Sequence, residues 1–410
     1  MKYTSGQYVS KQLMDNIFEV EDELTKEALA GTALAITDTV KQKDFKNRIE
    51  DLSLGRNTVL FDANDKPSVY TVYKPDEKAR LDYLSNSGTH FTKSDGLHPA
   101  FIVNGNVVEI LIGKYLAVRV GGTNHAASLR GLDPAHTINY DNSLAACVAK
   151  GTGHHMVTQA EWAYLSLLAI REGFQPRGND YYGKSYQDAT EKAIAAYHYA
   201  SSGTNYTGRT LTGSGPIGWH LDGTPFSPAD LRGNVREWNG GYRINGGELQ
   251  IIENNNAADN TKDQSAASAL WKAILQDGSL VAPETADTYK WDYVTTAPVS
   301  GSAAFQLNIA IDNPPADATP YGVTTFSALG AKEGVTIHDL LRILGIMPTL
   351  VNAQLGTQYM RNVGERLGFA GGHWVSTSDA GLGYRNASDG RTHTNGSIGF
   401  RPAFYRALTA

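Results

Sequence analysis

Three short segments, far apart in the chain, each place a tryptophan beside residues that cap helices or make turns. They are Thr158-Gln159-Ala160-Glu161-Trp162, Gly233-Asn234-Val235-Arg236-Glu237-Trp238 and Gly371-Gly372-His373-Trp374. Tryptophans in such settings are typical core anchors of a loop-rich fold, and Gly233-Asn234 predicts a tight turn with positive φ. Because Glu161 and Glu237 each precede a tryptophan, we interpret both carboxylates as structural, with an acid/base pair in a cleft as the alternative.

The N-terminal residues have a helical pattern. Leu13, Ile17, Val20 and Leu24 recur at helical spacing, and Leu29, Ala33, Ile36 and Val40 repeat the pattern after a skip. A narrow apolar stripe of this kind is well buried against a copy of itself. We therefore predict residues 1–54 as a helical oligomerisation segment, with a trimer as one arrangement; packing against the chain's own globular domain is the alternative.

The rest of the chain divides into a small β region and one large domain. Residues 55–96 predict a β hairpin, with turn residues at 62–67, followed by a polar connection. Residues 97–410 predict one large domain with an insertion at about 254–350. The capping pattern Thr158…Glu161 predicts a helix over Thr158–Glu172. Within the insertion we expect helices near Ser265–Gln276 and Ile337–Leu344.

The three tryptophan segments resemble the motifs of formylglycine-generating-enzyme-like domains, also called sulfatase-modifying-factor domains. The resemblance continues through Gly153-His154-His155-Met156-Val157 before the first segment, Asp230-Leu231-Arg232 before the second, and Gly399-Phe400-Arg401 after the third. These domains are elaborated C-type lectin folds. The resemblance thus implies an α+β, C-type-lectin-like fold over residues 97–410, with Trp374, Phe400 and Arg401 in the scaffold and Arg401 bonded to backbone carbonyls.

The resemblance does not extend to the enzymes' chemistry. Formylglycine-generating enzymes need a cysteine pair to hold copper, whereas Cys147 is the only cysteine here. Related sulfoxide synthases use three histidines, and the adjacent His154 and His155 cannot easily converge on one metal. We predict no catalytic residues, no metal ligands and no cofactor, with an oxidoreductase of this clade as the alternative function. A structural calcium ion within 254–259 stays open, although the calcium-dependent sugar-binding motifs of the fold are missing.

Composition excludes further classes of protein. The formal net charge is -6 and no basic run is present, which argues against nucleic-acid binding. No apolar run approaches the ~20 residues of a membrane span, and the first residues have no apolar core of a secretory signal.

Several further segments resemble phage and prophage proteins of gut bacteria that are targets of diversity-generating retroelements. They include Ser53-Leu54-Gly55-Arg56-Asn57, His98-Pro99-Ala100-Phe101, Ile112-Gly113-Lys114-Tyr115, Pro176-Arg177-Gly178-Asn179 and Gly213-Ser214-Gly215-Pro216. In such variable proteins the C-terminal end of a lectin-like fold displays mutable residues on a fixed scaffold. The resemblance implies a receptor-binding or adhesion protein, in a virion such as a phage tail or on a bacterial surface.

The segment between Gly371 and Phe404 has the composition of a binding surface, with tyrosine, arginine and small polar residues between glycines. An ordinary surface loop is the alternative, as is a purely structural virion protein that uses this surface for assembly. We expect the partner to be a host-cell surface protein or glycan. The predicted ligand-binding residues are His373, Val375, Ser376, Thr377, Asp379, Tyr384, Arg385, Asn386, Asp389, Arg391, His393 and Asn395.

Overall fold

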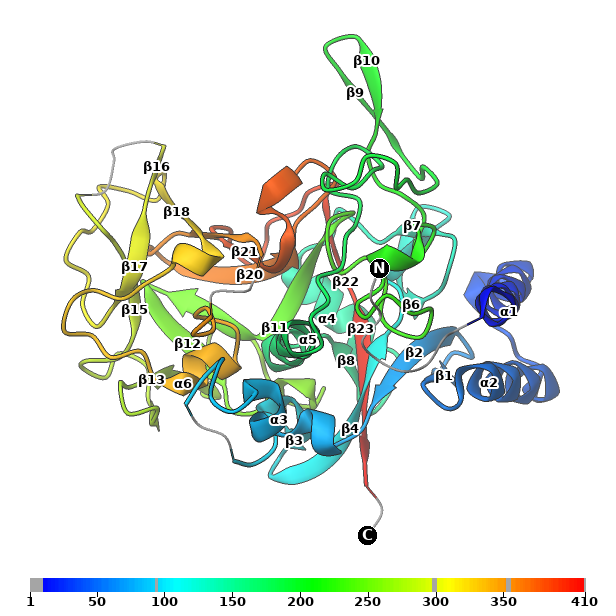
Figure 1. Cartoon of the computed structure of the whole chain (residues 1–410), viewed down its shortest axis with the longest axis horizontal. Coiled ribbons are helices and arrows are strands. Elements are labelled where there is room, and N and C mark those ends of the chain that lie inside the picture. The colour runs from blue at the N-terminus through cyan, green and yellow to red at the C-terminus, as the bar shows by residue number, and fades with distance from the viewer. Residues whose placement is uncertain (1–9, 93–94, 297–300, 352–354, 409–410) are drawn as a thin grey trace.

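The computed structural model describes residues 10–92, 95–296, 301–351 and 355–408. The chain is a mixture of short helices and strands (Figure 1), which confirms the predicted α+β class. Four sheets are present in the described parts of the chain, and two of them carry most of the structure. No helix in these ranges is both long and apolar enough to cross a membrane.

Two antiparallel helices form the N-terminal region, α1 (Lys11–Ala30) and α2 (Thr39–Ser53). The first half of the predicted stripe is buried, but against the chain itself: Ile17, Val20 and Leu24 pack in one cluster with Val69 and Leu129. The second half does not continue the stripe, because the chain turns between the helices and leaves Val40 76% exposed. The alternative of packing on the chain's own domain is thus confirmed, and the oligomerisation role stays a prediction.

The first large sheet combines strands from residues 57–156 with the last strand of the chain, β23. Its strands run in the order β1 (Asn57–Phe61), β2 (Pro67–Tyr73), β4 (Asn106–Gly113), β23 (Pro402–Ala407) and β8 (His154–Met156), and β3 (Ile102–Val103) pairs with β4. The predicted hairpin is β1–β2, and β2 continues into the sheet through β4. The boundary expected between residues 96 and 97 therefore does not separate two sheets; the connection before it holds the short helix α3 (Leu81–Ser85).

The second large sheet carries the candidate site. Its main path is β14 (Leu280–Val281), β13 (Trp271–Ile274), β12 (Glu248–Ile252), β11 (Arg236–Asn245), β20 (Glu365–Gly371), β21 (Gly381–Ala387), β19 (Thr357–Met360), β18 (Tyr321–Thr325) and β16 (Ser302–Ala303). Three strands pair off this path: β15 (Lys290–Tyr293), β17 (Phe305–Asn308) and β22 (Ile398–Phe400). The residues expected as an insertion supply both ends of this sheet, β13 and β14 at one end and β18 and β16 at the other.

One of the two helix predictions for residues 254–350 is wrong. Residues 271–274 form β13, because Trp271 and Ala273 are buried in the sheet and the strand pairs with β12. The other helix is confirmed as the short α6 (Asp339–Ile343), capped by the His338 side chain.

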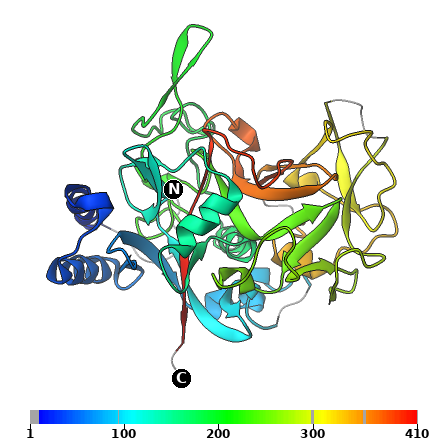
Figure 2. The same cartoon turned by 180° about the vertical axis from the view of Figure 1, so that it is seen from behind.

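Two helices cover opposite faces of the second sheet. Helix α5 (Gln159–Arg171) begins with the predicted capping box of Thr158 and Glu161, and its Trp162 shares a cluster with Tyr242 of β11. Helix α4 (Tyr140–Val148) packs against Trp238 and Phe369 on the other face. In Figure 1, α5 lies in front of the sheet, whereas in Figure 2 α4 lies in front.

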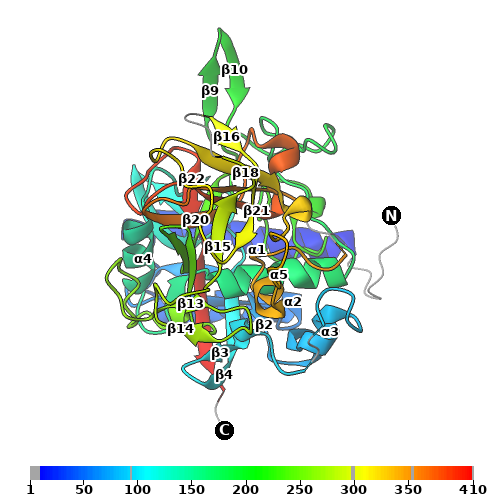
Figure 3. The same cartoon turned by 90° about the vertical axis from the view of Figure 1, so that its left-hand side faces the viewer.

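Two smaller sheets lie toward the same end of the molecule as the C-terminal loops. One is made of β6 (Thr123–Ser128), β5 (Ala117–Val120) and β7 (Asp133–Pro134). The other is a hairpin of β9 (His198–Ser201) and β10 (Thr204–Thr207), which projects from the body (Figure 3).

Candidate functional site

The candidate site is one face of β19 and β21, with two loops beside it. We call residues 372–380 the first rim and residues 388–397 the second rim. Because side chains alternate along a strand, Tyr384 and Asn386 of β21 point to the same face, and the pairing of Asn386 with Tyr359 places Tyr359 beside them. Arg236, on β11 two strands away from β21, reaches Tyr384 from the same side. We call the four residues Arg236, Tyr359, Tyr384 and Asn386 the site face. Helix α4 covers the neighbouring part of the same sheet surface, and β22 pairs with β11 beside it.

The polar groups of the site face are linked to one another. Arg236 Nε donates a hydrogen bond of 2.9 Å to the Tyr384 hydroxyl. The Tyr359 hydroxyl donates to Asp379 at 2.9 Å, and the Thr357 hydroxyl donates to the other oxygen of Asp379 at 2.8 Å. Burial raises the pKa of both phenols, and the bond to Asp379 adds to the increase for Tyr359. Both tyrosines are therefore neutral near pH 7, and Asp379 ties the first rim to β19.

The first rim is held mainly through its backbone. The Trp374 carbonyl accepts a hydrogen bond of 2.7 Å from the Tyr182 amide, and the Thr377 amide donates to the Asp180 carbonyl at 2.9 Å. Asp180 is itself fixed by an ion pair of 2.6 Å with Arg232. Thr377 has a φ of 52°, a conformation that β-branched residues seldom adopt.

The second rim is held in the same way. The carbonyl oxygens of its residues accept from the amides of Thr137, Tyr140 and Leu367 at 3.0 to 3.2 Å. Its last part is bound by Arg209, whose guanidinium donates to the Gly396 carbonyl at 3.1 Å. Backbone bonds of this kind do not depend on which side chain the rim residue carries.

Three of the predicted site residues are buried and cannot contact a ligand in this structure. Ser376, Tyr384 and Arg385 are 8%, 2% and 4% exposed. Tyr384 belongs to the site face but is covered by its neighbours there. Arg385 points to the opposite side of the strand, 5.6 Å from the Tyr242 ring, where burial lowers its pKa to about 10. The expectation that Tyr384 and Arg385 are ligand anchors is therefore corrected: both support the sheet.

Another group of predicted residues is only half-buried but is engaged within the protein. Arg391 makes a bidentate ion pair with Glu365 at 2.8 and 2.9 Å and a second pair with Asp141 at 2.5 Å. Asp389 lies 3.7 Å from Arg361. Glu365 begins β20 and Gly371 ends it, and at ~3.3 Å per residue the two ends are about 20 Å apart. The predicted residues thus form a strip along the sheet and not one cluster.

The remaining predicted residues present their side chains at the surface. Val375, Thr377 and His393 are half-buried, and Asn395 is exposed. His373 is also half-buried; burial, with a contribution from the charge of Arg236, lowers its pKa well below the usual range, so the ring is neutral. His373 Nδ1 has no hydrogen-bond partner within the described part of the chain. Of the predicted residues, these five reach the surface of the two rims, and Asn395 Oδ1 also accepts from the amide and hydroxyl of Ser397 at 3.0 and 2.9 Å.

The scaffold residues have the predicted roles. Arg401 is fully buried, donates to the carbonyls of Gly113, Lys114 and Ala229, and makes a bidentate pair with Glu237 at 2.8 and 2.9 Å. Trp162, Trp238 and Trp374 are 2%, 0% and 7% exposed, and Gly233 and Asn234 have φ of 76° and 59°.

The two buried glutamates and the adjacent histidines also serve the scaffold. His155 Nε2 lies 2.8 Å from Glu161, which completes the capping box of α5. His154 lies 3.2 Å from the Tyr70 hydroxyl. Because Glu237 is paired with Arg401, both glutamates are engaged in structural contacts.

Sequence reasoning missed Arg236 and Tyr359, which complete the site face, and a group of six tyrosines between residues 181 and 206. The signal for the tyrosines was visible as their local density in the sequence. Arg236 and Tyr359 had no comparable signal, because only the strand pairing brings them beside Tyr384.

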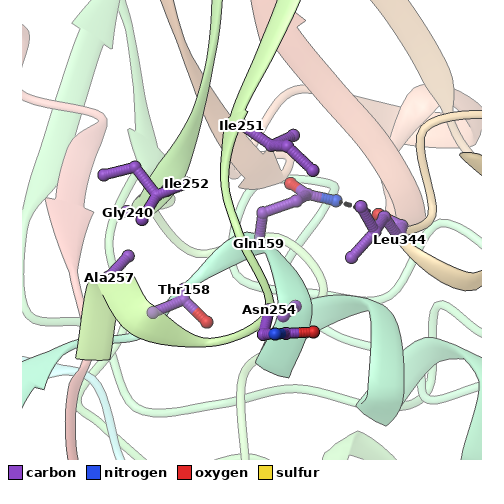
Figure 4. A pocket seen from close by; sticks show the side chains of 10 residues that line it. Thr158, Gln159, Gly240, Ile251, Ile252, Asn254, Ala257 and Leu344 are labelled. Atoms are coloured by element: carbon purple, nitrogen blue, oxygen red, sulfur yellow. Dashed lines mark hydrogen bonds between the residues drawn. The ribbon is translucent and has the colours of Figure 1, made fainter. Parts of the chain in front are cut away.

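A small hollow, with room for little more than a water molecule, lies away from the rims, where the start of α5 meets β11 and β12 (Figure 4). Its lining is mostly apolar, and the Gln159 amide across it donates to the Leu344 carbonyl at 2.5 Å. None of the predicted site residues lines it. It belongs to the packing of α5 against the sheet.

The residues considered for calcium are used in contacts within the protein. Asn256 Oδ1 accepts from the Asn104 amide at 2.6 Å, and Asp259 accepts from the side chains of Asn104 and Thr261 at 2.8 Å. In the described ranges no group of three or more histidine, cysteine, aspartate or glutamate residues is arranged to hold a metal ion.

No protein-family model matches the sequence, and neither does any curated protein. Among solved structures, the chain is similar to the Major Tropism Determinant U1 variant, with a TM-score of 0.30, 10% identity, and coverage of 86% of this chain and 72% of that one. It is also similar to Treponema denticola variable protein 1, with a TM-score of 0.31, 11% identity, and coverage of 85% of this chain and 98% of that one.

Proposed function

We propose that this chain is a non-enzymatic ligand-binding protein of the adhesion type, which displays exchangeable side chains on the two rims. The observation that carries the proposal is the way the rims are held. Donors outside the rims bind the backbone carbonyls of Trp374, Arg391, Asn395 and Gly396, so the exposed side chains beside them can change without loss of these bonds. A fixed scaffold with replaceable surface groups is what a variable binding protein needs.

The side chains on the rims suit binding better than catalysis. The displayed residues are His373, Val375, Thr377, His393 and Asn395, which offer apolar, aromatic and hydrogen-bonding groups. The acidic residues of the region, Glu365, Asp379 and Asp389, are each bonded or ion-paired within the protein. Adaptable polar groups of this kind are typical of paratope-like surfaces.

The proposal extends to location and assembly. The sequence resemblance favours a phage virion component, with a tail protein that contacts the host cell as the specific form. The partner is then a surface molecule of the host bacterium. Association of several copies would increase weak single-site binding through avidity.

A cell-binding experiment tests the function. Fluorescently labelled protein is added to a panel of intact gut bacterial isolates, and binding is measured by flow cytometry. A rim variant, V375S/T377G/H393A, is compared with V107S, a control on β4 at the opposite end of the molecule (Figure 1). We expect the rim variant to bind at least tenfold more weakly to any isolate that the unaltered protein binds, while it still unfolds in one cooperative transition on heating.

Equal binding by the rim variant and the control would contradict the assignment of the rims. A genomic observation gives an independent test of the variable character. We expect a near-copy of the codons for residues 371–404 beside a reverse-transcriptase gene, with differences mainly at adenines. A copy whose differences fall at random among the four bases would argue against diversification.

A further inference from the structure

A tyrosine-rich projection contacts both rims at its base. It consists of residues 193–207, which include the β9–β10 hairpin, and of the loop 181–186, and we call it the tyrosine arm. Figures 1 and 3 both show the hairpin extending beyond the rest of the molecule. Its two strands form a sheet of their own, with no strand of another sheet beside them in the described chain. Because an isolated two-stranded hairpin is marginally stable in water, this one depends on the contacts at its base.

The arm is built on a continuous series of tyrosines. Tyr199 lies directly opposite Tyr206 across the hairpin. The Tyr206 ring stacks on Tyr182 at 4.4 Å between centroids, and Tyr182 meets the edge of Tyr181 at 5.5 Å. Tyr181 in turn meets Tyr186 at 6.0 Å. The rings therefore extend from the hairpin to the loop beside it as one aromatic surface.

The base of the arm is joined to both rims. On one side the Tyr182 amide donates to the Trp374 carbonyl at 2.7 Å, and the Tyr197 ring lies 6.5 Å from the Trp374 ring. On the other side the Arg209 guanidinium lies 4.6 Å from the Tyr197 ring and donates to the Gly396 carbonyl. The arm is thus positioned relative to the rim side chains by the same contacts that hold the rims.

The arm exposes much of this aromatic surface. Tyr186, Tyr181, Tyr197 and Tyr199 are 53%, 43%, 40% and 37% exposed, and Ile194 beside them is 62% exposed. Residues 193–207 contain no aspartate, glutamate, lysine or arginine. In the loop 181–186 the one charged residue is the half-buried Lys184. A contiguous aromatic patch with few charges marks an interaction surface more often than ordinary protein surface, and tyrosine between serine, glycine and asparagine is the composition of antibody paratopes.

We propose that the tyrosine arm is a second part of the binding surface and that it contacts a protein on the host cell, which rests on the proposed function of the rims. The ring geometry favours a protein over a glycan. The plane of the Tyr181 ring makes angles of 62° and 74° with the rings of Tyr182 and Tyr186. The rings of Tyr182 and Tyr206 are stacked on each other, so these faces are not free for a ligand. The arm therefore has an uneven aromatic surface and not a flat platform on which a sugar ring could stack.

The test uses intact cells of an isolate that the unaltered protein binds. An arm variant, Y181S/Y186S/Y199S, is compared with the rim variant V375S/T377G/H393A and with the control V107S. Because the three tyrosines are on the surface, we expect the arm variant to keep the melting temperature. In parallel, the cells are treated with proteinase K to remove surface proteins or with periodate to oxidise glycans.

We expect the arm variant to bind at least tenfold more weakly, and protease treatment but not periodate to remove binding of the unaltered protein. If the arm variant binds as the control does while the rim variant is impaired, the arm is not part of the surface and the proposed function stands. If both variants bind as the control does, the proposed function fails as well. Loss of binding after periodate alone would overturn the choice of a protein partner.

Discussion

Replacing Arg401 should reveal how much the scaffold depends on one buried charge pair. The guanidinium is fully buried, and it is bound by Glu237 at 2.8 and 2.9 Å and by three backbone carbonyls at 2.8 to 3.2 Å. The substitution R401L leaves the Glu237 carboxylate buried without its partner, which costs about 3–5 kcal/mol of unfolding free energy. Three carbonyls lose a donor as well, at ~1 kcal/mol each.

The sum predicts that R401L lowers the unfolding free energy by about 6–8 kcal/mol. The double variant R401L/E237L removes the unpaired charge but not the unpaired carbonyls, so we expect it to regain about 3–5 kcal/mol relative to R401L. Urea unfolding followed by tryptophan fluorescence measures both differences. If the double variant is no more stable than R401L, the buried charge is not the main cost and the reasoning is wrong.

Three other changes test separate parts of the structure. G233A should destabilise the protein by at least ~2 kcal/mol, because its φ is 76° and an added Cβ would lie 2.2 Å from a backbone oxygen; an unchanged melting temperature would contradict the turn. T377G should raise the unfolding free energy by about 1 kcal/mol, because glycine relieves the positive φ, and T392G, which lacks that strain, is the control. Burial raises the pKa of Asp230 to about 6. The folded state thus favours the neutral acid, and this stabilisation is lost as pH rises from about 4 to 6. D230N should therefore gain stability relative to the unaltered protein over that range in urea titrations, and a difference independent of pH would refute the shift.

The parts of the fold that could be predicted from the sequence are those fixed by short-range chemistry. The capping box at Thr158 and Glu161 needs only four consecutive residues, and the Gly233-Asn234 turn needs two. Arg401 was placed correctly because the motif that contains it came with a known structural role.

The errors arose where long-range contacts decide the structure. The stripe of Ile17, Val20 and Leu24 shows that one face of a helix is buried, but not whether the covering surface belongs to the same chain. Residues 271–274 form a strand because β12 offers them a free edge, which no local pattern records. Likewise, alternation along β21 sets Tyr384 and Arg385 on opposite faces, and what covers each face depends on strands more than 100 residues earlier in the chain.

The same distinction explains how a binding surface can vary on this scaffold. A side chain is replaceable only if it does not hold its own loop in place. By that criterion Asp379 and Arg391 are poor positions for variation, because their carboxylate and guanidinium groups fasten the rims to Tyr359 and Glu365. The Thr377 side chain is not needed in this way, since the rim at that point is held by the bond from the Thr377 amide to the Asp180 carbonyl. The composition of residues 371–404 suggested that all of them form one display surface. Their contacts instead divide them into residues that hold the rims in place and residues whose side chains are displayed.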